Sequence, residues 1–292
     1  MGFKPQKIAI NGKIIPELVR VLGILPKEAQ KFIDRKRVRI NGKIFTDKKA
    51  TLNGEIEIIT FQPTPSQNKP IFEVKEFGVF DKPSGIAVHP KNLSNEQTLL
   101  DDVKYYLGND ANLAHRIDKE TSGLVLCGKT KQDEINLKKM FEEKKIQKYY
   151  LALVKGHLRE KIVIDKPILK NKTMDIKVKV VIDDKGKQSI TEITPIKIIG
   201  ENTLVLAKPL TGRQHQIRVH LYSIGHPIVG EPLYGVEYEI ADKYLDGKLS
   251  EEERIKHIGH HRLMLHSHKI EFEYKNQKYI IISNDFIPAT LS

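Results

Sequence analysis

A short segment without hydrophobic periodicity divides this chain into two unequal parts. Residues 62–70 hold three prolines among small polar residues. Because proline fixes φ and removes a backbone donor, such a segment continues neither a helix nor a central strand. The sequence therefore predicts an N-terminal domain of residues 1–61, a linker of residues 62–71 and a larger domain of residues 72–292.

Positive charge is concentrated before this segment. The 292 residues include 49 Lys plus Arg and 37 Asp plus Glu, which gives a formal net charge of +12. Residues 1–61 hold 13 of the basic and 6 of the acidic residues, more than half of the excess in about a fifth of the chain. An excess of this size favours a polyanionic partner, either nucleic acid or an anionic membrane surface.

Composition and hydropathy exclude several classes of protein. The single cysteine, Cys127, excludes an intrachain disulfide and a cysteine-rich zinc site. The first residues contain no apolar h-region and no run of 18 apolar residues occurs, so neither a signal peptide nor a membrane span is predicted. We expect a globular cytoplasmic protein in which Cys127 is a buried strand residue.

The N-terminal domain has the signals of a helix followed by a hairpin. Residues 26–35 have apolar side chains at helical spacing and begin with a proline, which suits a first helical turn. Residues 38–40 alternate as a strand, and Asn41-Gly42 is a strong signal for a hairpin turn. A second turn is predicted at Asn53-Gly54, leading into a strand over residues 55–59.

Short strands outnumber helices in the larger domain and cluster along the chain. This pattern favours an α+β fold with an antiparallel-rich mixed sheet and flanking helices, beside a small α/β N-terminal domain. The predicted strands are residues 72–80, 124–127, 178–182, 189–199 and 203–207, the predicted helices are residues 132–144 and 214–224, and a final hairpin joins residues 270–274 to 278–282 through Asn276-Gln277.

A cluster of polar residues stands directly before a predicted buried strand. Asp118 lies between Arg116 and Lys119, and neighbouring cations keep a carboxylate ionised and available as a nucleophile or base. Gly123 permits a tight turn into the strand. An ordinary charged turn explains the same residues, and physical reasoning alone leaves both explanations open.

Two other stretches carry groups suited to a site. Arg213 and Arg218 stand five apart at the start of a predicted helix, and a guanidinium there pairs with a carboxylate or a phosphate. Tyr150 lies on a predicted strand, where a tyrosine stacks on a flat base. A basic helix face and a core tyrosine are the plainer alternatives.

Taken together, these stretches resemble the RluA-type pseudouridine synthases. Residues 115–118 followed by residues 121–124 match the signature loop of that family. The other motifs are similar, in chain order, to residues 81–85 with His89-Pro90, to alternate residues of 148–156, and to the arginine helix continuing through residues 225–235. The resemblance covers about residues 72–235, with most of the C-terminal part through Leu265-His266, and implies isomerisation of uridine to pseudouridine in RNA.

The resemblance also implies roles for single residues. Asp118 matches the essential aspartate, and attack on the sugar, attack on the base and proton abstraction from the sugar all remain open for it. Arg218 matches the arginine that pairs with this aspartate. Tyr150 matches the tyrosine that stacks on the target base. Arg116 matches the arginine that fills the gap left when the nucleotide flips out of its stack.

His115 and Arg213, beside these positions, are predicted to contact the RNA. The sequence departs from the family pattern at Glu231, where Asp is usual, and after Phe272, where a His-Pro pair is missing. Neither departure touches the position of Asp118. The resemblance implies no metal and no organic cofactor.

The N-terminal domain resembles the alpha-L motif, a small RNA-binding module first known from a ribosomal small-subunit protein. The match lies in residues 29–33, 37–43 and 53–58, whereas residues 25–27 stand where that family usually has Ser-Arg. A solvated surface is the plainer explanation of the basic run at the junction of helix and strand. The predicted phosphate-binding residues of this run are Arg35, Arg37, Arg39 and Lys43.

The sequence therefore predicts an RNA pseudouridine synthase that acts on ribosomal RNA, with transfer RNA as the other open substrate and no membrane partner. A non-catalytic RNA-binding protein on the same fold and a glycosidase acting on nucleotides are the alternatives. Two further patterns are rejected. Residues 257–260 spell a synthetase tetrapeptide outside its nucleotide-binding context, and the histidines of residues 257–268 lack the spacing of a zinc site.

Overall fold

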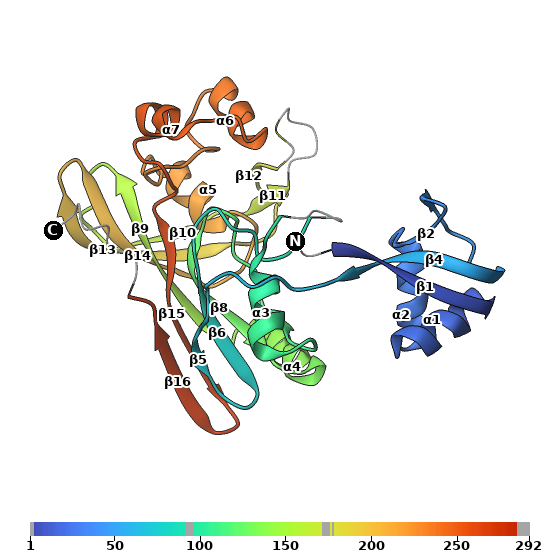
Figure 1. The fold of residues 1–292 in the computed structure, drawn as a ribbon. Helices are drawn as coiled ribbons and strands as arrows, with labels where there is room; N and C mark the ends of the chain where they lie inside the picture. Colours follow the sequence, from blue (N-terminus) through green and yellow to red (C-terminus); the bar gives the residue numbers. More distant parts are fainter. Residues whose placement is uncertain (1–2, 92–95, 171–175, 177, 285–292) are drawn as a thin grey trace.

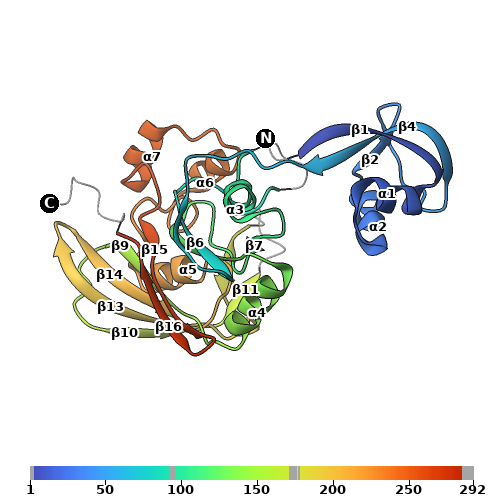
Figure 2. The same ribbon diagram turned by 60° about the horizontal axis from the view of Figure 1, so that its bottom comes forward.

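Two main sheets of different size organise the chain (Figure 1). The computed structural model describes residues 3–91, 96–170, 176 and 178–284. Residues 3–61 form a smaller unit, and the described residues from Pro70 onward form a larger one. The smaller unit stands to one side in both views, and one extended segment connects it to the larger unit (Figure 2).

The smaller unit is a four-stranded antiparallel sheet packed on two helices. Ile14, Leu18 and Ile33 of the helices belong to the same buried cluster as Val38 and Ile58 of the sheet. The unit therefore has an apolar core of its own. The strands in spatial order are β1 (Phe3–Lys13), β4 (Thr51–Phe61), β2 (Val38–Ile40) and β3 (Lys43–Ile44), and the helices are α1 (Ile14–Leu22) and α2 (Pro26–Asp34).

The predicted helix over 26–35, the strand over 38–40 and the hairpin after it are confirmed. The turn predicted at Asn53-Gly54 is wrong, because β4 is one continuous strand paired with β1 along its whole length. Gly54 has a φ of +131°, so this glycine accommodates a local distortion within a strand. The sequence predicts no element over residues 3–22, where the structure has β1 and α1.

Antiparallel pairing dominates the ten-stranded sheet of the larger unit, and β8 with β15 is the one parallel pair among its described residues. The predicted α+β class with an antiparallel-rich mixed sheet is confirmed. Along the main path the strands are β10 (Ile162–Asp165), β13 (Ile190–Ile199), β14 (Asn202–Pro209), β9 (Gln147–Lys155), β15 (Leu265–Tyr274), β8 (Ser122–Gly128), β6 (Phe77–Lys82) and β5 (Pro70–Glu73), while β16 (Gln277–Ile282) pairs with β15 and β7 (Asn112–Leu113) with β8.

Both faces of the central strand β8 are buried. Val125 and Cys127 pack in one apolar cluster, while Leu124 and Leu126 pack in another, as the alternation of a strand requires. Helices α3 and α5 contribute to the first cluster and α4 to the second. Cys127 is fully buried, as predicted, and burial raises the pKa of its thiol. No helix in the described part of the chain is long and apolar enough to cross a membrane.

The remaining elements close the larger unit. A small two-stranded sheet stands apart from the main one (Figure 1). Its strands are β11 (Ile168–Lys170) and β12 (Val180–Ile182), and the helices are α3 (Leu99–Leu107), α4 (Lys131–Glu142), α5 (Gln216–Ser223), α6 (Tyr238–Leu245) and α7 (Glu251–Ile258). Most predicted strands and both predicted helices of this unit agree with these bounds to within two residues.

Two predictions for the larger unit are wrong in detail. The strand predicted over residues 72–80 is a hairpin of β5 and β6, closed by a hydrogen bond from the N–H of Val74 to the Phe77 carbonyl. The final hairpin turns at Lys275 and Asn276 instead of Asn276-Gln277. Both turn residues have positive φ, of +51° and +62°, as a two-residue hairpin turn requires.

The linker is held against the larger unit. The N–H and Oγ of Ser66 donate to the Asp102 carboxylate at 2.6 and 2.9 Å, and the N–H of Thr64 donates to Asp101 at 3.3 Å. Both aspartates lie in the buried first turn of α3. Since β5 begins at Pro70, the segment between the two units is slightly shorter than the predicted 62–71 and is fixed at its middle.

Gly123 lies where β8 comes close to the backbone of β15. A Cβ at Gly123 (φ +104°) would lie 2.4 Å from the Ser267 carbonyl oxygen, whereas Gly108 (φ +101°) has nothing within 4 Å of an added Cβ. We predict that Gly123→Ala lowers the free energy of unfolding by about 3 kcal/mol, from overpacking and backbone strain together, and Gly108→Ala by about 1 kcal/mol from strain alone. Urea denaturation measures both, and equal losses would contradict the close approach of β8 and β15.

Candidate active site

Asp118 lies in the loop that leads from β7 into β8, and its side chain is 29% exposed. Hydrogen bonds fix this loop on both sides of Asp118. The Nε2 atom of His115 accepts the Leu126 N–H at 3.1 Å, and Ser84 Oγ donates to the Glu120 carbonyl at 2.6 Å. The carboxylate is therefore presented by a loop whose backbone is tied to neighbouring segments.

A buried lysine also holds the same loop in place through hydrogen bonds. Lys82 is fully buried, and its Nζ donates to the carbonyls of Pro83, Ile86 and Lys119 at 2.7, 2.8 and 3.0 Å. Burial lowers the pKa of Lys82 to about 7. Three carbonyl acceptors use all three protons of an ammonium group, so the charged form is the one that fits these contacts. Lys82 thus joins the segment after β6 to the residue next to Asp118.

Arg218 projects from α5, and the first turn of this helix is anchored by Gln216. The Oε1 atom of Gln216 accepts from Thr211 Oγ1 and the Arg213 N–H at 2.7 and 3.0 Å. Its Nε2 atom donates to the Ile190 carbonyl at 2.9 Å. These bonds fix the start of α5 against β13. They therefore also fix the position of the Arg218 side chain, two residues further along the helix.

The Arg218 guanidinium is shared between two carboxylates. It donates from Nε and Nη2 to the two oxygens of Glu231, both at 2.7 Å, and from Nη1 to Asp118 Oδ2 at 3.0 Å. The side chains of Arg218 and Glu231 are only 3% and 2% exposed. Glu231 Oε1 also accepts the Leu233 N–H at 2.8 Å. The bidentate pair with Glu231 therefore orients the guanidinium, and its remaining edge faces Asp118.

This arrangement keeps Asp118 ionised. Burial opposes the charge on Asp118, but the cationic forms of His215 and Arg218 and the hydrogen bond from Arg218 outweigh it, so the pKa of Asp118 falls below 3.8. Burial lowers the pKa of His215 to about 4, so His215 is neutral at neutral pH and Arg218 supplies the charge. Glu231 and Asp118 together raise the pKa of Arg218 above its ordinary value, against the effect of burial.

His215 connects Asp118 to a buried tyrosine. Its Nδ1 lies 2.9 Å from Tyr234 Oη, and its Nε2 lies 3.9 Å from Asp118 Oδ2. The Tyr234 hydroxyl accepts the Val180 N–H at 3.1 Å, which leaves its proton free to be donated to His215 Nδ1. This places the proton of the neutral imidazole on Nε2, on the side of Asp118.

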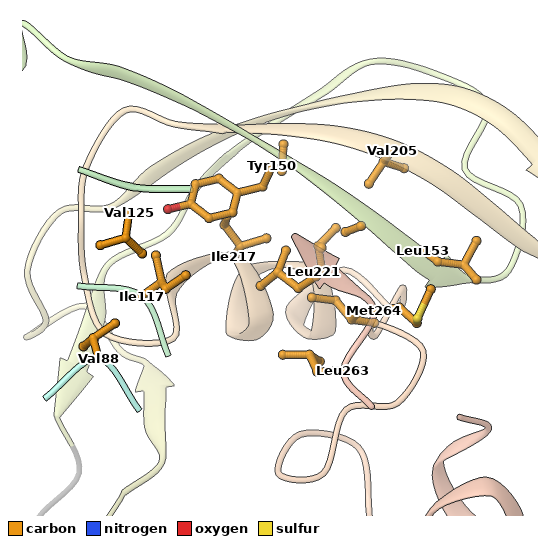
Figure 3. Packing of buried hydrophobic residues seen from close by; sticks show 14 of the residues in the cluster. Val88, Ile117, Val125, Tyr150, Leu153, Val205, Ile217, Leu221, Leu263 and Met264 are labelled. Carbon is orange, nitrogen blue, oxygen red and sulfur yellow. The ribbon is translucent and has the colours of Figure 1, made fainter. Parts of the chain in front are cut away.

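Tyr150 lies on β9, which is separated from β8 by β15 in the sheet, and it is 7% exposed. Figure 3 shows its ring beside Ile217, with the hydroxyl directed to the side where Ile117 and Val125 lie. Most of the ring therefore packs in the apolar cluster, as expected of a core tyrosine. Tyr150 also lines the cavity described next, so its exposed edge is available to a ligand. Burial raises the pKa of its hydroxyl, which keeps the proton on it.

A cavity of about 560 Å³ opens onto these groups. Asp118, Tyr150 and Arg218 line it together, although they come from a loop, a strand and a helix. The structure also brings the predicted RNA contacts of the larger unit to this cavity. They are His115, Arg116 and Arg213, and Lys148 and His215 join them. Arg116 and Arg213 are exposed, whereas the His115 ring packs against Phe141 with ring centroids 4.5 Å apart.

The four basic residues predicted in the N-terminal domain do not line this cavity. Arg35 and Lys43 are exposed on the smaller unit. The Arg37 guanidinium lies over the Phe3 ring, 4.5 Å from its centroid, and Arg39 forms an ion pair with Glu57 at 3.7 Å. Arg37 and Arg39 therefore also have packing partners within the unit.

Sequence reasoning missed three contributors to the site. From the sequence, Glu231 is only a departure from the family pattern. In the structure, Glu231 is the main partner of Arg218. Lys82 lies within the motif of residues 81–85 and Tyr234 within residues 225–235, and the sequence predicts no role for either. Arg218 and Glu231 are 13 positions apart and pair only in the folded chain. No local sequence pattern therefore identifies Glu231. Among the described residues, no three His, Cys, Asp or Glu side chains gather as a metal site.

Comparisons with known proteins identify the family. The model of the RNA pseudouridylate synthase family matches residues 76–223, a span that includes Asp118, Tyr150 and Arg218. The chain belongs to this family. It is 44% identical over 271 residues to a protein of Helicobacter pylori named "Uncharacterized RNA pseudouridine synthase", which covers 91% of this chain and 90% of that protein. It is therefore an isomerase that converts uridine to pseudouridine in RNA.

Other relatives have more specific names. Ribosomal large subunit pseudouridine synthase C of Buchnera aphidicola is 36% identical over 82% of this chain and 71% of its own length. The protein of the same name from Haemophilus ducreyi is 32% identical over 88% of this chain and 82% of its own. Among solved structures, Human RNA Pseudouridylate Synthase Domain Containing 1 aligns with a TM-score of 0.61 and 25% identity over 78% of this chain and 89% of that one. The synthase fold thus extends over most of the chain.

Replacement of Glu231 tests whether it orients Arg218. Glu231→Gln removes the buried one of the two carboxylates that contact Arg218 and turns an amide donor toward the guanidinium. We predict a loss of about 3–5 kcal/mol in the free energy of unfolding, because a buried cation loses its main partner. Urea denaturation measures this loss. Glu160→Gln, at an exposed acid, is the matched control, and an equal effect of the two changes would contradict the role of Glu231.

Proposed function

We propose that this synthase modifies uridines of large-subunit ribosomal RNA, with Asp118 as the catalytic group. The observation that carries the proposal is a carboxylate held ionised by Arg218 at 3.0 Å on the wall of a cavity. The names of the relatives from Buchnera aphidicola and Haemophilus ducreyi supply the class of RNA. Transfer RNA is the competing substrate in the test below.

The chemistry requires a base that has left its stack. Conversion to pseudouridine breaks the bond between N1 and C1′ and joins C5 to C1′, while the hydrogen on C5 leaves to solvent and N1 takes up a proton. A stacked base hides the glycosidic bond, so the uridine must flip out to meet Asp118. The cavity of about 560 Å³ is large enough for one nucleotide. We assign the exposed Arg116 at this cavity to the gap that the base leaves.

Tyr150 and the apolar side chains near it form the base-binding wall in this proposal. The phenol is protonated and mostly buried, so it offers a ring edge and a hydroxyl proton at a fixed position. Ile217 packs beside it on α5 (Figure 3). Apolar side chains that line the same cavity as a charged carboxylate suit a uracil ring, which has apolar faces and a polar edge.

We assign the smaller unit, residues 1–61, to RNA binding as an alpha-L type module. Support comes from its own apolar core, from its excess of basic residues and from the exposure of Arg35 and Lys43. Lysine and arginine contacts to phosphates add affinity without choosing a base. Because the linker is bonded to α3, RNA on this module is kept near the larger unit.

Tritium release from RNA labelled at C5 of uridine tests this function. We predict that the protein releases tritium from large-subunit ribosomal RNA transcribed in vitro, and that Asp118→Asn lowers the rate by about 10³-fold or more, because the neutral amide cannot replace the carboxylate. Asp184→Asn, at an exposed aspartate, is the matched control and keeps the wild-type rate.

The other outcomes separate the alternatives. Release from transfer RNA alone would move the proposal to that substrate. Binding of RNA without release from any RNA would indicate a non-catalytic RNA-binding protein, and free uracil as the product would indicate a glycosidase. An Asp118→Asn variant with the wild-type rate would contradict the role of Asp118.

A further inference from the structure

A second cavity, of about 790 Å³, adjoins the catalytic loop. The segment 118–122 separates the two cavities, because Asp118 and Thr121 line the catalytic one while Glu120 and Ser122 line this one. The linker contributes Asn68 to its wall, and the segment around α7 contributes Arg254 and Arg262. The family comparison and the reaction assign nothing to this cavity.

The carboxylates of this cavity are already occupied. Glu120 pairs with Arg254 at 2.7 Å, and both side chains are largely buried. The Asp81 carboxylate accepts a hydrogen bond from Ser283 Oγ. The ammonium of Lys82 is held by three backbone carbonyls, as described above. Each of these groups therefore already has a partner within the protein.

Arg262 lacks such a partner. Its Nη1 donates to Ser122 Oγ at 3.1 Å, and no carboxylate among the described residues pairs with it. The side chain is partly buried on the wall of the cavity. The cavity thus holds one guanidinium on its wall that no carboxylate of the described residues neutralises, and such a group pairs with an anion that has several oxygens.

We propose that this cavity binds a phosphate group of the RNA substrate through Arg262. A phosphodiester carries a single negative charge, which matches the single uncompensated guanidinium. One wall of the cavity is the linker that leads to the basic smaller unit, and an RNA strand contacting both units supplies phosphates along this path. Arg262 also donates to Ser122 at the start of β8, so it links the proposed phosphate site to the segment 118–122, which includes Asp118.

The salt dependence of RNA affinity tests this site in the full-length protein. Each neutralised phosphate contributes about 0.7 to the slope of log affinity against log salt for single strands and about 0.9 for duplex. We expect Arg262→Gln to make this slope shallower by one such increment, and Arg262→Lys, which keeps the charge, to retain it. Arg159→Gln, at an exposed arginine outside the cavity, is the control and leaves the slope unchanged.

The slope separates a phosphate contact from a structural role of Arg262. A change that only disturbed Ser122 would alter stability or rate while keeping the wild-type slope, and that result would overturn the proposal. Inorganic phosphate tests the other source of the same group. If it raises the Tm of the wild type but not of Arg262→Gln while the slopes agree, the cavity binds free phosphate and the assignment to RNA is overturned. Tritium release by the wild type, measured in parallel, reports separately on the reaction.

Discussion

The geometry of this active site depends on one guanidinium that two carboxylates share. Glu231 takes two of the Arg218 donors at 2.7 Å and Asp118 takes a third at 3.0 Å, in a region where Arg218 and Glu231 are almost fully buried. Glu231 also accepts hydrogen bonds from the backbone N–H groups of Leu233 and Tyr234, whereas Asp118 lines the cavity. The Asp118 carboxylate is thereby both oriented and kept ionised.

The fold serves this pairing by fixing each partner independently. Gln216 anchors α5 and hence Arg218, while Lys82 and Ser84 brace the loop of Asp118. Gly123 allows β8 to approach β15, and β15 also pairs with β9, the strand that carries Tyr150. A loop, a helix and a strand from distant parts of the chain therefore meet at one cavity with little freedom to move apart.

Much of this architecture is predictable from local sequence patterns, because most strands of the larger unit, together with α4 and α5, follow from periodicity and turn residues. Helices α3, α6 and α7 were not predicted. The failures have physical causes. Asn53-Gly54 has the sequence of a turn, but pairing with β1 keeps it in a strand. Asp118, Tyr150 and Arg218 were identified through family motifs, whereas Glu231 and Lys82 act through burial and tertiary contacts that no spacing reveals. The contact between the linker and Asp102 was hidden for the same reason.

The most direct test is the titration of Asp118 itself. Carboxyl carbon NMR of aspartate-labelled protein, with the resonance assigned by its loss in Asp118→Asn, reports the charge on this side chain. If the cationic forms of His215 and Arg218 together outweigh burial, the pKa of Asp118 is below 3.8, and the resonance at pH 3.8 is mainly that of the carboxylate. A midpoint at or above pH 3.8 would show that burial outweighs the ion pair and would contradict the account.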